Sequence, residues 1–99
     1  MGMKNQTKNT ESLLAGELTS NEIVNRIFNE FENQLLDKKE MVLDFRNVTF
    51  ISVYFLERLG SLVEKAREFK VNIQITNVQP NIYKVFQVGR IERVLKVCG

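Results

Sequence analysis

The sequence predicts an α/β fold, and three patterns carry that prediction. Residues 41–45 are almost entirely apolar and are bounded by turn signals, which is typical of a strand covered on both faces. Residues 71–76 alternate apolar and polar side chains, which is the period of a half-exposed strand. Amphipathic helical spacing occupies residues 23–36 and 53–69. Because strands alternate with helices along the chain, we expect a sheet with parallel neighbours.

The first part of the chain predicts a tail, a short strand and a helix. Residues 1–10 contain no large apolar residue beyond methionine, so we expect a disordered tail there and one domain over residues 11–99. A leucine-rich patch around Gly16 predicts a strand and a turn. Thr19 and Glu22 have the spacing of a capping box at the start of the first helix. Its apolar stripe runs over about four turns through Ile23, Val24, Ile27, Phe28, Phe31, Leu35 and Leu36.

The remaining elements follow from local signals. A second apolar stretch at 48–51 precedes Ser52, which is suited to cap the helix over 53–69. Pro80 suits the first turn of a third helix, and Gly89 suits its end. Apolar residues at 91–97 predict a last helical turn and a final short strand. The inward stripes of these helices and strands predict that four side chains are buried in the core, namely Phe28, Leu43, Leu59 and Ile73.

Composition excludes several classes of function. The chain has 14 Lys and Arg against 12 Asp and Glu, so its net charge of +2 does not predict nucleic-acid binding. It has no histidine and a single cysteine, Cys98, which excludes histidine-based catalysis, histidine-ligated metal and an internal disulfide. No apolar run reaches the roughly 18 residues of a membrane span, and no signal peptide is evident. We therefore expect a cytoplasmic protein without membrane insertion.

No motif in the sequence predicts catalysis or a cofactor. The five glycines do not form a phosphate-binding loop, and the carboxylates show no paired spacing. Asp44 ends the central apolar stretch, where open sheets often place catalytic groups. The alternative is that its carboxylate caps the following loop through backbone N–H groups. We predict no cofactor, no metal and no enzymatic activity.

Three bulky residues stand together where the second helix begins: Val53, Tyr54 and Phe55. One helix stripe cannot bury three consecutive positions, so at least one of them must face outward. In one interpretation, Val53 and Phe55 belong to the core and Tyr54 lies against the surface. In the other, the three form an exposed contact patch for a partner.

The second helix also offers a candidate interface stripe. Tyr54 and Arg58 lie four residues apart and share a face, with Glu57 beside them and Ser61 continuing the stripe. This stripe avoids the apolar stripe of the same helix, so we expect it to face outward and bind a partner. The alternative is that Arg58 is a solvated helix residue and that Tyr54 packs on the neighbouring loop. The predicted partner-binding set is Ser52, Val53, Tyr54, Phe55, Glu57, Arg58 and Ser61.

From residue 12 to 97 the pattern resembles a STAS domain, the fold of anti-sigma factor antagonists. The segment Met41–Ile51 is similar to the family's apolar strand, Asp and short return, and Gly16-Glu17-Leu18 resembles the family's G-x-L before its first helix. Asn77–Pro80 and Val85–Ile91 resemble the exit of the last strand and the third helix. The resemblance implies a single STAS-like domain with a mixed β-sheet and helices packed mainly on one side.

In that family a partner kinase phosphorylates a serine in an Asp-Ser-Ser-Gly loop. The matching residues here are Ser52-Val53-Tyr54-Phe55, so Val53 stands at the acceptor position and has no hydroxyl. The resemblance therefore implies a non-catalytic, regulatory protein-binding module that is not phosphorylated at Val53. Its partner would be an anti-sigma factor or kinase-like protein, and a homodimer is possible. The alternatives are a soluble STAS subunit of a larger complex, such as a lipid-transport ABC system, and a small-molecule or nucleotide sensor.

Overall fold

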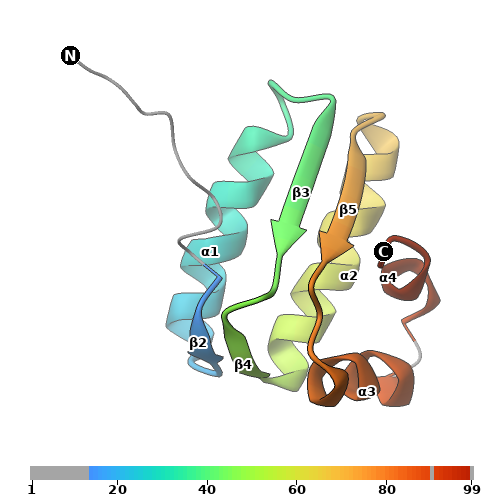
Figure 1. Ribbon diagram of the computed structural model, residues 1–99. Coiled ribbons are helices and arrows are strands. Elements are labelled where there is room, and N and C mark those ends of the chain that lie inside the picture. Colours follow the sequence, from blue (N-terminus) through green and yellow to red (C-terminus); the bar gives the residue numbers. More distant parts are fainter. Residues whose placement is uncertain (1–13, 90, 99) are drawn as a thin grey trace.

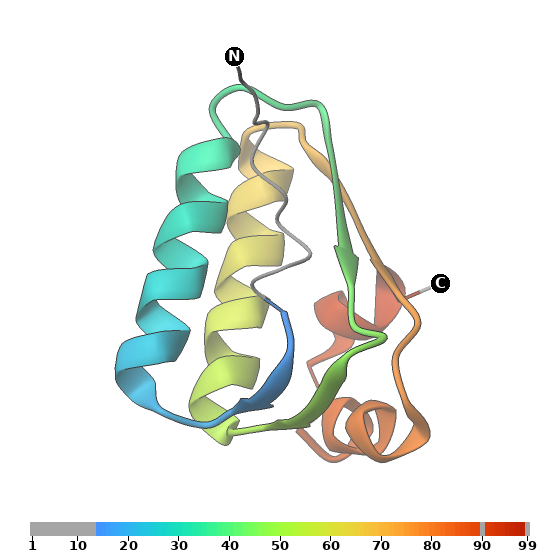
Figure 2. The same cartoon turned by 60° about the vertical axis from the view of Figure 1, so that its left-hand side comes forward.

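The computed structural model describes residues 14–89 and 91–98, and the expected tail at residues 1–10 lies outside them. Helices α1 and α2 pack side by side on one face of the strands (Figures 1 and 2). The elements within the described residues are, in order, β2 (Gly16–Leu18), α1 (Asn21–Gln34), β3 (Glu40–Asp44), β4 (Val48–Ile51), α2 (Val53–Glu68), β5 (Asn72–Thr76), α3 (Pro80–Gly89) and α4 (Glu92–Lys96).

The strands pair as two parallel ladders, β2 with β4 and β3 with β5. A turn at 46–47 joins β3 to β4, so the two ladders follow each other along one bent surface (Figure 2). Cys98 adds a parallel bridge beside Ile75. The predicted α/β class with helices mainly on one side is confirmed. Within the described residues every strand pairing is parallel, so the antiparallel part of a mixed sheet does not occur among them.

The core lies between the strands and the helices. All four residues predicted to be buried, namely Phe28, Leu43, Leu59 and Ile73, are at most 5% exposed. Five phenylalanines form a continuous series of edge-to-face contacts with ring centroids 5.0–6.0 Å apart, which is the favourable geometry for aromatic pairs. The series connects α1 to α3 and runs Phe31, Phe28, Phe55, Phe45, Phe86.

Three local predictions were wrong. Strand β3 is covered on one face only, because Val42 is 44% exposed while its neighbours Met41 and Leu43 are buried. Helix α1 is capped by Ser20, whose hydroxyl accepts the Ile23 N–H, and not by a capping box at Thr19. The apolar stripe of α1 is also narrower than expected, since Ile23 and Leu36 at its two ends are exposed.

Candidate functional site

The start of α2 is held in place by hydrogen bonds on both sides of Ser52. The Ser52 hydroxyl accepts the Phe55 N–H at 3.1 Å, which confirms the predicted cap. The Ser52 N–H donates to the Leu18 carbonyl oxygen at 3.2 Å, so the end of β4 is tied to β2. Val53, the first residue of α2, follows this anchored position with its side chain 70% exposed. The fold therefore presents Val53 to solvent from a fixed backbone.

The predicted partner-binding set divides between surface and interior. Val53, Glu57 and Ser61 are exposed and lie four residues apart along one face of α2. Phe55 is fully buried, so its prediction as part of a contact patch was wrong. Its ring packs between those of Phe28 and Phe45, at 5.0 and 6.0 Å between centroids. The two interpretations of the bulky triplet are thus both partly wrong, since Val53 is outside and Phe55 is core.

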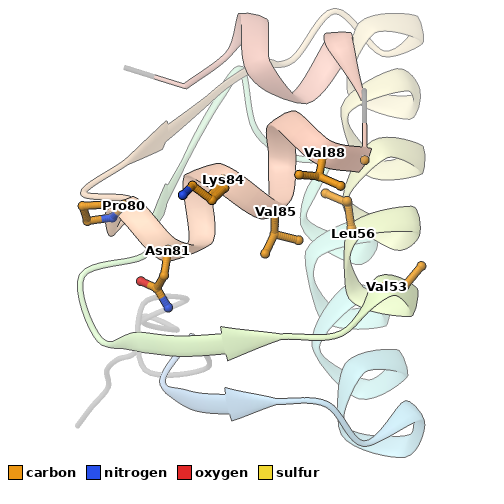
Figure 3. A pocket seen from close by; sticks show the side chains of 8 residues that line it. Val53, Leu56, Pro80, Asn81, Lys84, Val85 and Val88 are labelled. Atoms are coloured by element: carbon orange, nitrogen blue, oxygen red, sulfur yellow. The ribbon is translucent and has the colours of Figure 1, made fainter.

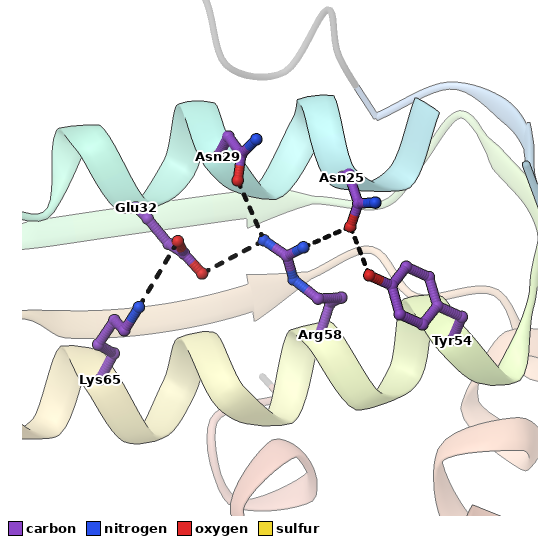
Figure 4. Close-up of polar contacts among 6 residues, drawn as sticks. All are labelled: Asn25, Asn29, Glu32, Tyr54, Arg58 and Lys65. Atoms are coloured by element: carbon purple, nitrogen blue, oxygen red, sulfur yellow. Dashed lines mark hydrogen bonds and ion pairs between the residues drawn. The ribbon is translucent and has the colours of Figure 1, made fainter. Parts of the chain in front are cut away.

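Tyr54 and Arg58 do not face outward as predicted; they face α1 (Figure 4). The Tyr54 hydroxyl and the Arg58 guanidinium both donate to the side-chain oxygen of Asn25, which uses both of its lone pairs. Arg58 also donates to Asn29 at 3.5 Å and forms an ion pair with Glu32 at 3.3 Å. Tyr54 and Arg58 share a face of α2 as predicted, but that face contacts a polar stripe of α1, whereas Glu57 and Ser61 of the same predicted stripe are exposed.

We call this group the interhelical cluster: Asn25, Asn29, Glu32, Tyr54, Arg58 and Lys65. Arg58 has a side chain only 20% exposed and lies over the Phe28 ring, 5.5 Å from its centroid. Lys65 lies 3.6 Å from the other Glu32 oxygen, so one carboxylate receives two cations. The cluster therefore joins α1 to α2 within the domain.

An apolar groove lies on the other side of α2, where α3 approaches it (Figure 3). Its volume is about 640 Å³. Eight residues from the start of α2 and from α3 line it: Val53, Leu56, Pro80, Asn81, Lys84, Val85, Val88 and Gly89. Val88 is 76% exposed, so two of the most exposed apolar side chains of the described residues, Val53 and Val88, border the same groove. We call it the α2–α3 groove.

Polar side chains fix the position of α3 beside β4 and so preform this groove. The Gln79 side-chain amide donates to the carbonyl oxygen of Val48 at 2.9 Å and to that of Arg46 at 3.3 Å. Asn81 donates to the Thr49 carbonyl oxygen at 3.3 Å. These contacts hold the start of α3 against β4 and the turn before it. At its far end α3 comes very close to α2 at Gly89.

Sequence reasoning missed the α3 side of the groove. A Cβ atom at Gly89 would clash with the Cδ2 methyl group of Leu56, so a larger residue there would force the Leu56 side chain to move. A signal for the groove was present in α3 itself. Ile82 and Phe86 fill its buried face, and Val85, which packs partly against the core, forms a second apolar row with the exposed Val88. Which helix would lie opposite that row was not readable from the sequence.

Asp44 caps the loop that follows β3, as one of the two interpretations predicted. Its Oδ1 accepts the Arg46 N–H at 2.9 Å and the Asn77 side-chain amide at 3.0 Å. Both hydrogen bonds lower the pKa of Asp44, and the one from Asn77 has the larger effect. The Arg46 guanidinium, 3.3 Å away, acts in the same direction. The carboxylate is therefore a stable anion that holds the β3 and β5 exits together.

Two further chemical features concern metals and thiols. Within residues 14–89 and 91–98, no three His, Cys, Asp or Glu side chains are grouped so that they could hold a metal ion. Cys98 is partly buried, and burial raises the pKa of its thiol. The thiol therefore stays protonated near neutral pH, which disfavours a nucleophilic role.

Comparison with known protein families decides the family. The family model of the STAS domain matches residues 14–98, a range that contains every described residue. The chain belongs to the STAS family. STAS domains are in general non-catalytic and serve as anti-sigma factor antagonist-like or interaction modules. No curated protein matches this STAS chain closely enough to refine its role. In the part of the chain that the structure describes, no helix has the length and apolar character needed to cross a membrane.

Proposed function

We propose that this STAS domain is a regulatory protein-binding module of the anti-sigma factor antagonist kind, and that it docks through the exposed start of α2. The observation that carries the proposal is the placement of Val53. It is an apolar side chain, 70% exposed, on a backbone fixed by the Ser52 cap and beside the α2–α3 groove. An exposed apolar residue at the edge of a preformed groove is the arrangement expected of an interface anchor.

The proposal extends to the mode of control. The resemblance to anti-sigma factor antagonists aligns Val53 with their phosphorylated serine, and valine cannot accept a phosphate. The neighbouring Ser52 hydroxyl is engaged in capping α2. We therefore expect binding that is constitutive with respect to phosphorylation at this loop. The partner is expected to be an anti-sigma factor or kinase-like protein, or the adjacent subunit of a larger complex.

The test is a capture experiment with the chain as bait and Val53→Asp as the variant. A negative charge at the first position of a helix favours the helix, so Val53→Asp should fold while placing a desolvation penalty in the interface. A matched control is Gln74→Asp, which adds the same charge on the exposed face of β5. We expect a partner to bind the native chain and Gln74→Asp but not Val53→Asp. A partner that binds all three equally would place the interface elsewhere.

Phosphorylation is tested separately by intact-mass measurement after incubation with ATP and the captured kinase-like protein. We expect no added phosphate. A stoichiometric phosphate on Ser52 or Tyr54 that abolishes binding would contradict the proposed mode of control. If the captured partner is instead a transporter subunit, the larger-complex alternative replaces the anti-sigma factor interpretation.

A further inference from the structure

The α2–α3 groove carries one cation and no anion. Lys84 is the only charged residue among the eight that line it. Lys84 is exposed, makes no ion pair with any residue that the structure describes, and belongs to a helix with no Asp or Glu. The other lining side chains are apolar apart from Asn81. A ligand that fills this groove would thus meet an apolar floor and a single ammonium group at its border.

The shape of the groove favours a helix as its occupant. It lies between two helices, and its apolar residues are spaced as helical rows, with Val85 and Val88 on α3 and Val53 and Leu56 on α2. Its α3 wall is ten residues long, which corresponds to about 15 Å or nearly three helical turns. An amphipathic helix commonly binds in such a groove through residues spaced i, i+3, i+4 and i+7.

Charge argues against a second copy of this chain as the occupant. A symmetric dimer through the groove would bring two Lys84 side chains into one interface, and no carboxylate lines the groove to pair with them. A partner that carries its own carboxylate avoids the repulsion between two unpaired ammonium groups and forms a charge-assisted contact with Lys84. We propose that the α2–α3 groove receives the apolar face of an amphipathic helix from the partner, and that Lys84 pairs with an Asp or Glu of that helix. This inference rests on the proposed function.

The test begins by placing a photo-cross-linking amino acid at Val88, in the full-length chain, and sequencing the partner peptide that becomes attached. We expect a peptide with helical apolar spacing and at least one carboxylate. A synthetic copy of that peptide is then titrated against the native chain and against Lys84→Glu. We expect the dissociation constant to rise about tenfold in Lys84→Glu and to recover when the peptide's carboxylate is replaced by Lys.

Lys38→Glu is the matched control, because it changes the net charge equally at an exposed position beyond the end of α1. It should leave the dissociation constant unchanged. This result distinguishes an ion pair between Lys84 and the peptide from an attraction that depends only on the net charge of the chain. The inference is overturned by a cross-link to a second copy of this chain, by a captured peptide without a carboxylate, or by equal binding of Lys84→Glu and Lys38→Glu. It is also overturned if position 88 captures nothing while laurate, an anionic amphiphile, binds the groove. If Val53→Asp abolishes binding but Lys84→Glu does not, only this inference fails and the proposed function stands.

Discussion

Replacing Arg58 with alanine should destabilise the domain, because its side chain makes several contacts between α2 and α1. Arg58 donates to Asn25, pairs with Glu32 at 3.3 Å and lies over the Phe28 ring. Each contact is worth about 0.5–1 kcal/mol at this partial exposure. Asn25 and Glu32 keep their bonds to Tyr54 and Lys65, so neither is left without a partner. We therefore expect Arg58→Ala to lower the free energy of unfolding by about 2 kcal/mol.

Two further variants, Arg58→Lys and Glu32→Gln, show how much of the lost stability comes from each contact of Arg58. Arg58→Lys keeps the charge but loses the planar fork that reaches Asn25 and Glu32 together, so about half of the loss should remain. A double-mutant cycle of Arg58→Ala with Glu32→Gln should give a coupling free energy of about 0.5–1 kcal/mol. Because the pair is partly exposed, raising the salt concentration should reduce this coupling.

The assay is equilibrium unfolding in urea, with Glu57→Ala as the control. Glu57 precedes Arg58 on α2 and is exposed, so its replacement should change the free energy of unfolding by no more than about 0.5 kcal/mol. If Arg58→Ala changes the free energy of unfolding by as little as Glu57→Ala does, the interhelical cluster does not stabilise the fold. The outward-facing interpretation of Arg58 would then regain support, above all if partner binding were lost at the same time.

Three further outcomes are expected. Leu59→Ala, at a fully buried position, should cost about 2–5 kcal/mol in urea unfolding, and a loss under about 0.5 kcal/mol would contradict the core assignment. Asp44 has a lowered pKa in the folded state, so its contribution to stability is present above the unfolded-state pKa and is lost as pH falls through the folded-state pKa. Asn77→Gly keeps the left-handed backbone at φ 57° but removes the side-chain amide that donates to Asp44. This variant should raise the folded-state pKa of Asp44 in an NMR titration and reduce the stability that is lost on acidification. Cys98 should react with a thiol reagent at neutral pH more slowly than free cysteine, and a reaction as fast as that of free cysteine would show that it is not shielded.

Local signals predicted the elements of this fold well. The Ser52 cap, the start of α3 at Pro80 and its end at Gly89 are all confirmed, because each depends on a few neighbouring residues. The alternation around Ile73 correctly predicted a strand with one buried face. The same criterion failed for β3, since its exposed position carries Val42, and an apolar residue there hides the alternation.

The candidate site was less predictable, because it depends on which elements face each other. Helical spacing correctly grouped Tyr54 with Arg58, but spacing within one helix does not say what lies opposite. The complementary signal was in α1, where Asn25, Asn29 and Glu32 lie at i, i+4 and i+7 and form a polar stripe. Two polar stripes of matching spacing on two helices that both pack on one sheet predict their own contact. Reading them as a pair would have placed Arg58 inside the domain.

In the proposed function, the two sides of α2 separate stability from recognition. On the α1 side, Tyr54 and Arg58 satisfy their donors within the domain, so a partner that bound there would first have to break those hydrogen bonds. On the α3 side, Val53 is already exposed, and Lys84 forms no ion pair with any residue of the described ranges, 14–89 and 91–98. In the proposed interface, binding on this side therefore buries apolar surface and forms an ion pair, and no ion pair among the described residues has to break. For this reason variants of Arg58 should move the urea midpoint and spare binding, whereas variants of Val53 and Lys84 should do the reverse.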